Sequence, residues 1–333
     1  MKDTTKIKVE HYINQVNNHL LSFLSGKPLE LYQASTHYLK SGGKRLRPLM
    51  VIKSCEMFGG NQHDALPAAT AVEFIHNFSL VHDDIMDNDD FRHGIPTVHK
   101  SFGLPLAILS GDILFSKAFQ ILSTTYVNSI KDSSLISMIR RLSSACVDIC
   151  EGQAKDVQFA QIETFPSEEE YIEMISKKTA ALFNVSCSLG ALSSRNATEK
   201  DVNNMSIFGK SSGIAFQLID DLIGIAGHSK ETGKAVGNDI REGKKTYPIL
   251  LSIKMASELE RNQILKVFGK GNCDTDSLKK VIDIISSLQI EKIVRKSAMD
   301  YIEKANNAII NYEDSDPKKI LQELSNYIVE RRK

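Results

Sequence analysis

The segment that most constrains the fold is residues 68–90, where an apolar helix leads directly into a cluster of aspartates. The segment contains neither glycine nor proline, and its apolar residues recur at steps of three and four: Val72, Ile75, Phe78, Val81 and Ile85. This spacing predicts a helix with one apolar face. Since the apolar part leads straight into the acids, we expect the helix to rise from a core into a cavity.

The acidic end of this helix has the spacing of a metal site. Asp83 and Asp87 are four residues apart, so their carboxylates share one helix face roughly 6 Å apart, while Asp84 is rotated by about 100°. Like charges at this spacing weaken a helix unless a cation lies between them. Hard carboxylate oxygens suit Mg2+, which shares its coordination shell with water and phosphate. We therefore favour a magnesium site over a solvated acidic surface.

The composition excludes several classes of protein. The 333 residues balance 41 Lys and Arg against 41 Asp and Glu, so no global positive charge points to nucleic acid. The most apolar stretch, residues 104–122, contains Asp112 and Lys117, so we predict no transmembrane segment. The polar N-terminus is unlike a signal peptide, and five cysteines without a CxxC pair predict reduced thiols in a cytoplasmic protein.

Nearly every segment has the periodicity of a helix, and none alternates like a strand. The exceptions are residues 91–103 and the glycine-rich residues 227–243, which we predict to be loops. The prediction is an all-α fold, a large helical bundle in which residues 1–333 form a single domain with the site between core helices. Besides the acidic helix, the predicted helices are 9–24, 29–39, 49–58, 105–126, 133–161, 167–192, 198–225, 246–259, 276–288, 291–311 and 317–332.

A second acidic pair, Asp220 and Asp221, also ends an apolar helix, in the stretch FQLIDDLIG. Two such pairs are stronger evidence than one, because facing helices clamp metal ions from both sides. Cationic residues lie outside both acidic helices, and Gly42-Gly43 precedes three of them at a helix start, where free N–H groups favour anions. Carboxylates that need a divalent metal, together with separate cationic groups, indicate a site for more than one diphosphate. The cationic residues are Lys44, Arg45, Arg47, Arg92, Lys177, Lys178, Lys234, Lys244 and Lys245. For Lys177 and Lys245 we favour a solvated surface charge over a role in binding.

Ordered motifs between about residues 40 and 250 resemble those of the trans-isoprenyl diphosphate synthases (polyprenyl synthetases): GGKRLRP, HDDIMD, FRHGIPT, KKTAALF, FQLIDDLIG and GNDIREGKKTYP. The resemblance implies the isoprenoid synthase fold, with two aspartate-rich helices facing across a central cavity, in a homodimer. It also implies head-to-tail condensation of isopentenyl diphosphate with an allylic diphosphate. The magnesium ligands that it implies are Asp83, Asp84, Asp87, Asp220 and Asp221.

The resemblance also implies roles on the allylic side of the reaction. Arg92, Lys178 and Lys234 contact the diphosphate as it leaves. The carbonyl oxygens of Lys178 and Gln217, with the hydroxyl of Thr179, stabilise the allylic cation by preorganised dipoles. Proton loss to the released diphosphate is expected, so no side chain is predicted to be the general base.

Isopentenyl diphosphate is expected on Lys44, Arg47 and His76, although a packed helix histidine is the competing interpretation of His76. Lys244 closes the site over both substrates. The family usually has Arg-Arg-Gly after its first acidic motif, and here His93 replaces the second arginine. The resemblance implies that this second arginine binds isopentenyl diphosphate, and His93 lacks its fixed charge and bidentate fork.

Product length is expected to depend on Phe78 and Ser79. Phe78 lies five residues before Asp83, about 7.5 Å further from the metal end of the helix. A lone aromatic at this position resembles archaeal-type geranylgeranyl diphosphate synthases, with farnesyl or longer-chain polyprenyl synthases as the alternative. Ordinary core packing of Phe78 is the competing interpretation. Gly224 replaces the third aspartate of the usual DDxxD motif, which removes a more distant metal contact and resembles archaeal members.

Three other functions fit parts of this pattern. A non-catalytic partner subunit typically lacks one acidic motif or the GGK lysine, and both are present. A terpene cyclase holds no second diphosphate, so Lys44 and Arg47 argue against it. A metal phosphohydrolase built on His82 and Asp83 needs further histidine ligands. The last arginines, Arg331 and Arg332, are predicted to belong to a frayed basic tail, with assistance to the substrate site as the alternative.

Overall fold

Helices form nearly all of the regular structure, which confirms the predicted all-α class. The computed structural model describes residues 3–126, 130–226 and 237–331, with residues 3–10 described as backbone alone. The chain divides into two compact units. Unit 1 consists of Met1–Val147, Leu182–Gly209 and Ala308–Leu324. Unit 2 consists of Asp148–Ala181, Lys210–Asn307 and Ser325–Lys333. The single domain over residues 1–333 stays a prediction.

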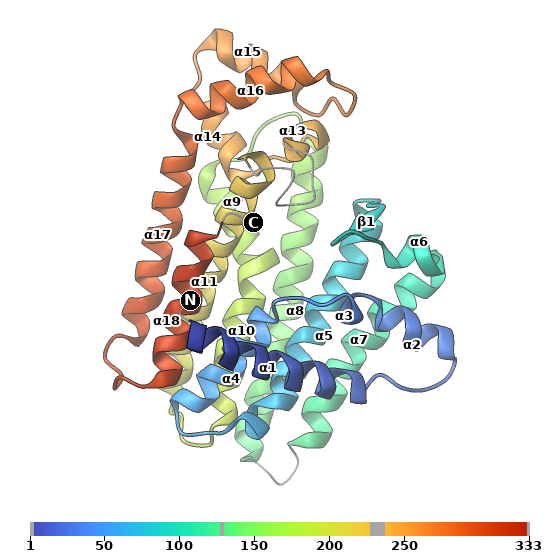
Figure 1. The fold of residues 1–333 in the computed structure, drawn as a ribbon, viewed down its shortest axis with the longest axis vertical. Coiled ribbons are helices and arrows are strands. Elements are labelled where there is room, and N and C mark those ends of the chain that lie inside the picture. Colours follow the sequence, from blue (N-terminus) through green and yellow to red (C-terminus); the bar gives the residue numbers. More distant parts are fainter. Residues whose placement is uncertain (1–2, 127–129, 227–236, 332–333) are drawn as a thin grey trace. The chain divides into compact units, whose positions relative to one another are not determined.

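Figure 1 labels the elements in chain order. The α-helices are α1 (Asp3–Ser22), α2 (Leu29–Ser35), α3 (His37–Lys40), α4 (Leu46–Met57), α5 (Gln62–Met86), α6 (Val98–Phe102), α7 (Leu104–Thr125), α8 (Asp132–Gln161), α9 (Glu168–Ile175), α10 (Ala181–Ser193), α11 (Glu199–Ala226), α13 (Asn238–Glu242), α14 (Tyr247–Met255), α15 (Glu258–Val267), α16 (Thr275–Ser287), α17 (Ile290–Ile309) and α18 (Asp316–Glu330).

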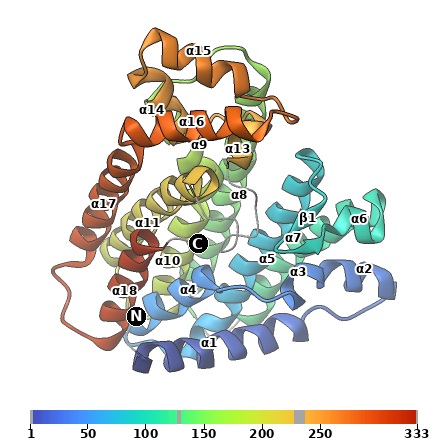
Figure 2. The same cartoon turned by 45° about the horizontal axis from the view of Figure 1, so that its top comes forward.

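Helix α5, which carries the first acidic cluster, begins six residues before the segment that the sequence pattern marks. Asn61 and Asp64 form a capping box, in which each side chain accepts a hydrogen bond from the other residue's backbone N–H. The predicted stripe is buried at Val72, Ile75 and Val81. Helices α4 and α7 pack against α5, and α1 crosses both α4 and α5 (Figure 2). The acids therefore stand at the end of a buried helix, as the pattern predicts.

Helix α7 also has the length and composition of a membrane span, and 39% of its most apolar window is buried inside the protein. Core helices of globular proteins pass the same test. Since α7 packs along α5, we interpret it as a helix of the bundle. Several of its apolar side chains are nevertheless exposed, including Leu104, Ile108 and Leu109.

The predicted loop over residues 91–103 is wrong, because it contains a short hairpin and helix α6. Strands β1 (Phe91–Arg92) and β2 (Ile95–Pro96) pair antiparallel across the two residues His93 and Gly94. Both turn residues have positive φ, +52° and +79°, as a two-residue hairpin turn with right-handed twist requires. The side chain of Arg92, the residue before the turn, points back to α5 and contacts Asp84.

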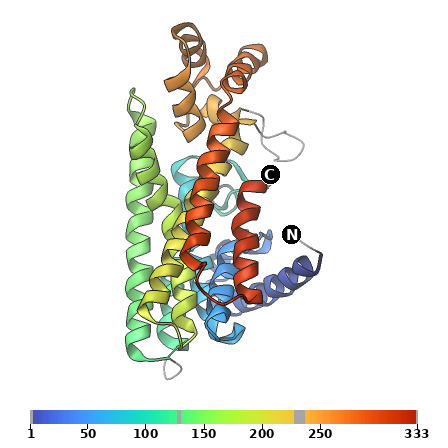
Figure 3. The ribbon, with the colours of Figure 1, turned by 90° about the vertical axis from the view of Figure 1, so that its left-hand side faces the viewer.

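Two further predicted helices are each divided. The predicted helix 167–192 consists of α9, a π-helical turn η1 (Ser176–Ala180) and α10. The predicted helix 246–259 ends at Met255, because a capping box between Ser257 and Glu260 starts α15. Helices α15 and α16 then pack side by side (Figure 3). Of the predicted loop 227–243, residues 227–236 lie outside the described residues, and α13 occupies most of the rest.

Candidate active site

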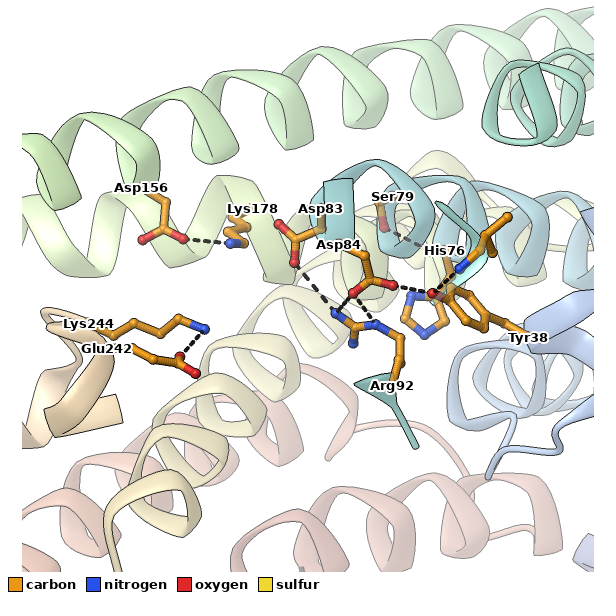
Figure 4. Close-up of polar contacts among 11 residues, drawn as sticks. Tyr38, His76, Ser79, Asp83, Asp84, Arg92, Asp156, Lys178, Glu242 and Lys244 are labelled. Atoms are coloured by element: carbon orange, nitrogen blue, oxygen red, sulfur yellow. Dashed lines mark hydrogen bonds and ion pairs between the residues drawn. The ribbon is translucent and has the colours of Figure 1, made fainter. Parts of the chain in front are cut away.

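The three acids at the end of α5 have different environments. Asp84 is buried with 1% of its side chain exposed, whereas 22% of the Asp83 side chain is exposed and Asp87 is exposed at the helix end. Asp84 accepts hydrogen bonds from the Tyr38 hydroxyl and from Arg92 Nε, the latter across 2.6 Å (Figure 4). Arg92 Nη2 also lies 3.9 Å from Asp83 Oδ2. Asp84 thus holds Arg92 beside the more exposed Asp83.

Tyr38 is a residue that the sequence analysis missed, because nothing in the sequence distinguishes it from a core tyrosine. It packs in an apolar cluster with Ala34, Val81, Val98 and Ala107. Its oxygen also accepts a hydrogen bond from the Val98 backbone N–H across 3.2 Å. Burial, together with the hydrogen bond to Asp84, raises the pKa of Tyr38, so it stays a hydrogen-bond donor.

The GGK loop before α4 is fixed by Arg45, the residue that follows Lys44. Arg45 has φ +46° and is buried, with Nη1 2.8 Å from Glu73 Oε1 and Nη2 2.6 Å from the Leu39 carbonyl oxygen. Its Nε donates to Asn17 across 2.8 Å. The neighbouring Lys44 is exposed. Arg45 therefore has a structural role, and Lys44 is the cation of this loop that a ligand can reach.

The structure brings together Arg47 and His76, two of the residues predicted to bind isopentenyl diphosphate. Arg47 Nη1 lies 3.3 Å from His76 Nε2, and its guanidinium lies 4.4 Å from the centre of the Phe183 ring. Arginine is always a donor, so this nitrogen of His76 accepts and the ring is neutral. Burial, then the charges of Arg47 and Arg92, lower the pKa of His76 well below 6.5. His93, exposed in the hairpin turn, adds a smaller effect of the same sign.

The second acidic pair on α11 repeats the division between a buried and an exposed acid. Asp220 is exposed, whereas Asp221 is buried and accepts hydrogen bonds from the Tyr171 hydroxyl and from Gln217 Nε2, the latter across 2.8 Å. Burial raises the pKa of Asp221 to about 7, and the charges of Asp239 and Asp220 add to the rise, against the two hydrogen bonds. Tyr171 and Asp239 are further residues that the sequence analysis did not single out.

Arg331 does not belong to a frayed tail, and that prediction is wrong. Only 9% of the residue is exposed, and its Nη2 donates to Asp220 Oδ1 across 2.8 Å and to the Phe216 carbonyl oxygen across 3.2 Å. Its guanidinium carbon lies 3.9 Å from the centre of the Phe216 ring. Sequence position alone suggested fraying, whereas the apolar and acidic surface of α11 binds the side chain.

The π-helical turn η1 holds two of the residues predicted to act on the allylic side. The absence of a side chain at Gly152 lets α8 approach the backbone of this turn closely. A Cβ at Gly152 would lie 2.2 Å from the backbone nitrogen of Lys178. Lys178 Nζ pairs with Asp156 across 2.6 Å (Figure 4). The Thr179 hydroxyl donates to Gln217 Oε1 across 2.8 Å. π-Turns within helices are frequent at functional sites.

The remaining predicted residues have local partners or lie outside the described chain. Lys244 pairs with Glu242 across 3.0 Å (Figure 4), and Lys234 lies outside the described residues. The Phe78 ring packs edge-on against Phe115 of α7, with centroids 5.2 Å apart, yet remains partly exposed. The Ser79 hydroxyl donates to the His76 carbonyl oxygen across 2.8 Å.

The chemistry of these acids fits a hard divalent cation. All the donors are carboxylate oxygens, and a guanidinium already lies on Asp220. Within residues 3–126, 130–226 and 237–331, no three His, Cys, Asp or Glu side chains are grouped to hold an ion by themselves. Mg2+ needs no such cage, since it is bound through one or two carboxylates plus substrate phosphates. The phosphohydrolase alternative, which requires added histidine ligands at His82, gains no support from these residues.

The protein is all-α, and each of its two separate aspartate pairs lies next to an arginine. Two further cations, Lys44 and Arg47, lie at the GGK loop and the start of α4. These are the features of a diphosphate-dependent transferase. The model of the polyprenyl synthetase family matches residues 28–285. The chain belongs to the polyprenyl synthetase family.

Relatives and solved structures agree with this assignment. The geranylgeranyl diphosphate synthase of Sulfolobus acidocaldarius is 41% identical over 324 residues, covering 96% of this chain and 97% of that protein. The geranylfarnesyl diphosphate synthase of Aeropyrum pernix is 36% identical, covering 96% and 99%. The crystal structure of geranylgeranyl pyrophosphate synthetase from Pyrococcus horikoshii has a TM-score of 0.92 at 36% identity, covering 99% of each chain. The predicted isoprenoid synthase fold is confirmed.

Proposed function

We propose that this protein is a trans-prenyltransferase that condenses isopentenyl diphosphate head-to-tail with an allylic diphosphate and releases a twenty-carbon product, geranylgeranyl diphosphate. Family membership and the geranylgeranyl synthases among its relatives support this activity. The observation that carries it is the pair of acidic motifs, each with one buried acid held by a tyrosine and one more exposed acid next to an arginine. Each motif therefore offers an accessible carboxylate.

The acids of the two motifs, Asp83, Asp84, Asp87, Asp220 and Asp221, would hold Mg2+ together with the allylic diphosphate. Asp84 and Asp221 would do so with oxygens that already accept hydrogen bonds. When bound, Mg2+ neutralises the departing diphosphate and lowers the cost of an allylic cation. Arg92, Lys178 and Lys234 add positive charge to the same leaving group. Arg92 is already ordered for this by Asp84, and Lys178 by Asp156.

The hydroxyl of Thr179 is suited to face the allylic cation. Its proton is directed to Gln217 Oε1, which leaves the oxygen lone pairs pointing elsewhere. The backbone carbonyl oxygens of Lys178 and Gln217 complete a set of fixed dipoles for the developing positive charge. After condensation, the newly joined isopentenyl unit loses a proton to the released diphosphate, so no side chain has to act as a general base.

Isopentenyl diphosphate binds Lys44, Arg47, His76 and His93. The exposed Lys44 and the partly buried Arg47 flank the start of α4, and the neutral His76 accepts from Arg47 and so orients it. Lys244 exchanges Glu242 for diphosphate when the site closes. A terpene cyclase would have no use for this second group of cations.

We also infer that two copies of the chain associate and that the enzyme works in the cytoplasm. The exposed apolar side chains of α7, Leu104, Ile108 and Leu109, offer a surface for a second copy. All five cysteines are free, as expected of a reducing compartment. Size-exclusion chromatography with light scattering tests the homodimer.

The activity is tested by measuring pyrophosphate release from the purified chain with Mg2+. Release is expected only when isopentenyl diphosphate and an allylic diphosphate are both present, and it is lost with a chelator. Release from the allylic diphosphate alone would identify a cyclase or a phosphohydrolase. No release under any condition would favour the non-catalytic subunit.

A further inference from the structure

Gln153 of α8 has a buried hydrogen-bond donor that lacks a partner within the described protein. Only 9% of the residue is exposed, and its Nε2 donates to no acceptor among residues 3–126, 130–226 and 237–331. Buried amide groups are almost always hydrogen-bonded, because a donor that leaves water without finding an acceptor costs free energy. A donor of this kind is explained if it serves a bound ligand.

The donor belongs to the face of α8 that packs against the π-helical turn η1. Gly152, the preceding residue, lies directly against the backbone of Lys178, and Asp156 pairs with Lys178 Nζ across 2.6 Å (Figure 4). Positions 152, 153 and 156 lie within about 100° of one another around the helix, so they share this face. Ile149, one turn before Gln153, is buried on the same face. All of these residues belong to unit 2.

The same π-helical turn carries groups expected on both sides of the bond that breaks. Lys178 Nζ is expected to contact the departing diphosphate, whereas the Thr179 hydroxyl and the Lys178 carbonyl oxygen are expected to face the allylic cation. An amide N–H presents the positive end of its dipole, so it suits the anionic side of this bond and not the cationic side. A donor beside η1 therefore fits the oxygen that joins the diphosphate to the allylic carbon.

We propose that Gln153 Nε2 donates a hydrogen bond to this bridging oxygen of the allylic diphosphate. The inference rests on the proposed prenyltransferase function. When the carbon–oxygen bond breaks, its electron pair stays on the oxygen, and the growing negative charge strengthens the hydrogen bond. No proton is transferred in this step. Gln153 is then a catalytic residue that stabilises the leaving group.

The test compares an oxygen with a sulfur at the bridging position. Calorimetry with Mg2+, in the absence of isopentenyl diphosphate, measures the binding of geranyl diphosphate and of its thiolo analogue, in which sulfur replaces the bridging oxygen. Sulfur is a weak acceptor, so the analogue gains little from the donor. In Gln153→Met the affinity for geranyl diphosphate is expected to fall about 3- to 10-fold, with the affinity for the analogue nearly unchanged.

Turnover and a matched variant complete the comparison. Turnover of Gln153→Met is expected to fall about 10-fold or more, because the hydrogen bond is stronger in the transition state than in the bound substrate. Gln158→Met makes the same change at an exposed position of α8 and should bind and turn over like the unchanged protein. The midpoint of urea unfolding of Gln153→Met should stay the same or rise, because the substitution removes a buried donor that has no partner among the described residues.

The outcomes are distinct. An equal loss of affinity for the two compounds in Gln153→Met, or no loss for either, would overturn the inference, as would normal turnover with a lowered unfolding midpoint. Gln153→Leu, which also lacks the donor, gives the same comparison if the methionine variant does not fold. If the unchanged protein binds neither compound with Mg2+, the proposed function itself fails.

Discussion

Arg331 donates to Asp220 across 2.8 Å, so that the last described residue of the chain neutralises an acid near the end of α11. Arg92 does the same for Asp84 in the first motif. In both places a guanidinium balances carboxylates that would otherwise repel one another. When a divalent cation binds, Asp220 has to be shared between it and Arg331.

Replacing Arg331 should therefore change stability and metal affinity in opposite directions. Arg331→Gln is expected to lower the free energy of unfolding without metal by about 1.5–3 kcal/mol, the contribution of a charged hydrogen bond. The Mg2+ concentration for half-maximal turnover should fall several-fold, because a competing cation is gone. Denaturant unfolding in chelator and a magnesium titration measure the two effects. A higher magnesium requirement would mean that Arg331 assists binding instead of competing.

The acids of each motif should respond differently to removal. Asp83→Ala is expected to fold normally and to lose at least ~100-fold in turnover, as when an electrostatic stabiliser is lost. Asp220→Ala should lose as much turnover and also about 1.5–3 kcal/mol of stability, because it leaves the buried Arg331 without its carboxylate. Asp84→Ala leaves Arg92 partly buried without its carboxylate, which should cost about 3–5 kcal/mol of stability. Turnover assays with thermal unfolding of each variant make the comparison. Near-normal turnover in folded Asp83→Ala would exclude its metal role.

Much of this arrangement was predictable from the sequence because it depends on local patterns. The period of the apolar residues identified α5 and α11, and the acids at their ends followed directly. The start of α5 was predicted too late, because Pro67 near its N-terminus obscured the Asn61–Asp64 capping box. The hairpin after α5 was missed because His93 occupies a turn position where asparagine is the usual signal.

What the sequence did not predict are contacts between distant residues. Tyr38 and Asp84 are 46 positions apart, and Arg331 and Asp220 are 111 apart. No periodicity encodes such pairs, since they depend on how helices pack. The contact between Asp239 and Gly224, where a Cβ would lie 2.1 Å from Asp239 Oδ2, is of the same kind, although the glycine at position 224 was itself a visible departure from the family pattern.

Stability should depend on pH through His76. Its pKa in the folded protein lies well below the ordinary 6.5 because of burial and nearby arginines. Below pH 6.5 the unfolded chain therefore binds a proton that the native state refuses. The contribution of neutral His76 to the free energy of unfolding is fully present above pH 6.5. It is lost as pH falls, by up to ~1.4 kcal/mol per pH unit.

His76→Gln should remove this part of the pH dependence. Urea unfolding of both proteins at pH 7.5 and 5.5 gives the comparison, and the unchanged protein is expected to lose about 1 kcal/mol more than the variant over this interval. Equal losses in the two proteins would show that His76 becomes protonated in the native state as readily as in the unfolded chain.

Product length should follow the size of the side chains at positions 78 and 79. Phe78→Ala removes a partly exposed ring and is expected to lengthen the product beyond twenty carbons, whereas Ser79→Phe is expected to shorten it to fifteen. If Phe78 only packs against Phe115, Phe78→Ala should instead cost roughly 3–5 kcal/mol of stability with product length unchanged. Mass spectrometry of the products and thermal unfolding distinguish the two cases.

This chain by itself is expected to elongate an allylic diphosphate with isopentenyl units and to stop at twenty carbons. The most direct measurement is the mass of the products formed by the purified protein from Mg2+, isopentenyl diphosphate and each allylic primer in turn. Primers of different length are expected to converge on geranylgeranyl diphosphate. A product of another length would contradict the twenty-carbon limit, and a cyclic hydrocarbon or no elongation of any primer would contradict the prenyltransferase itself.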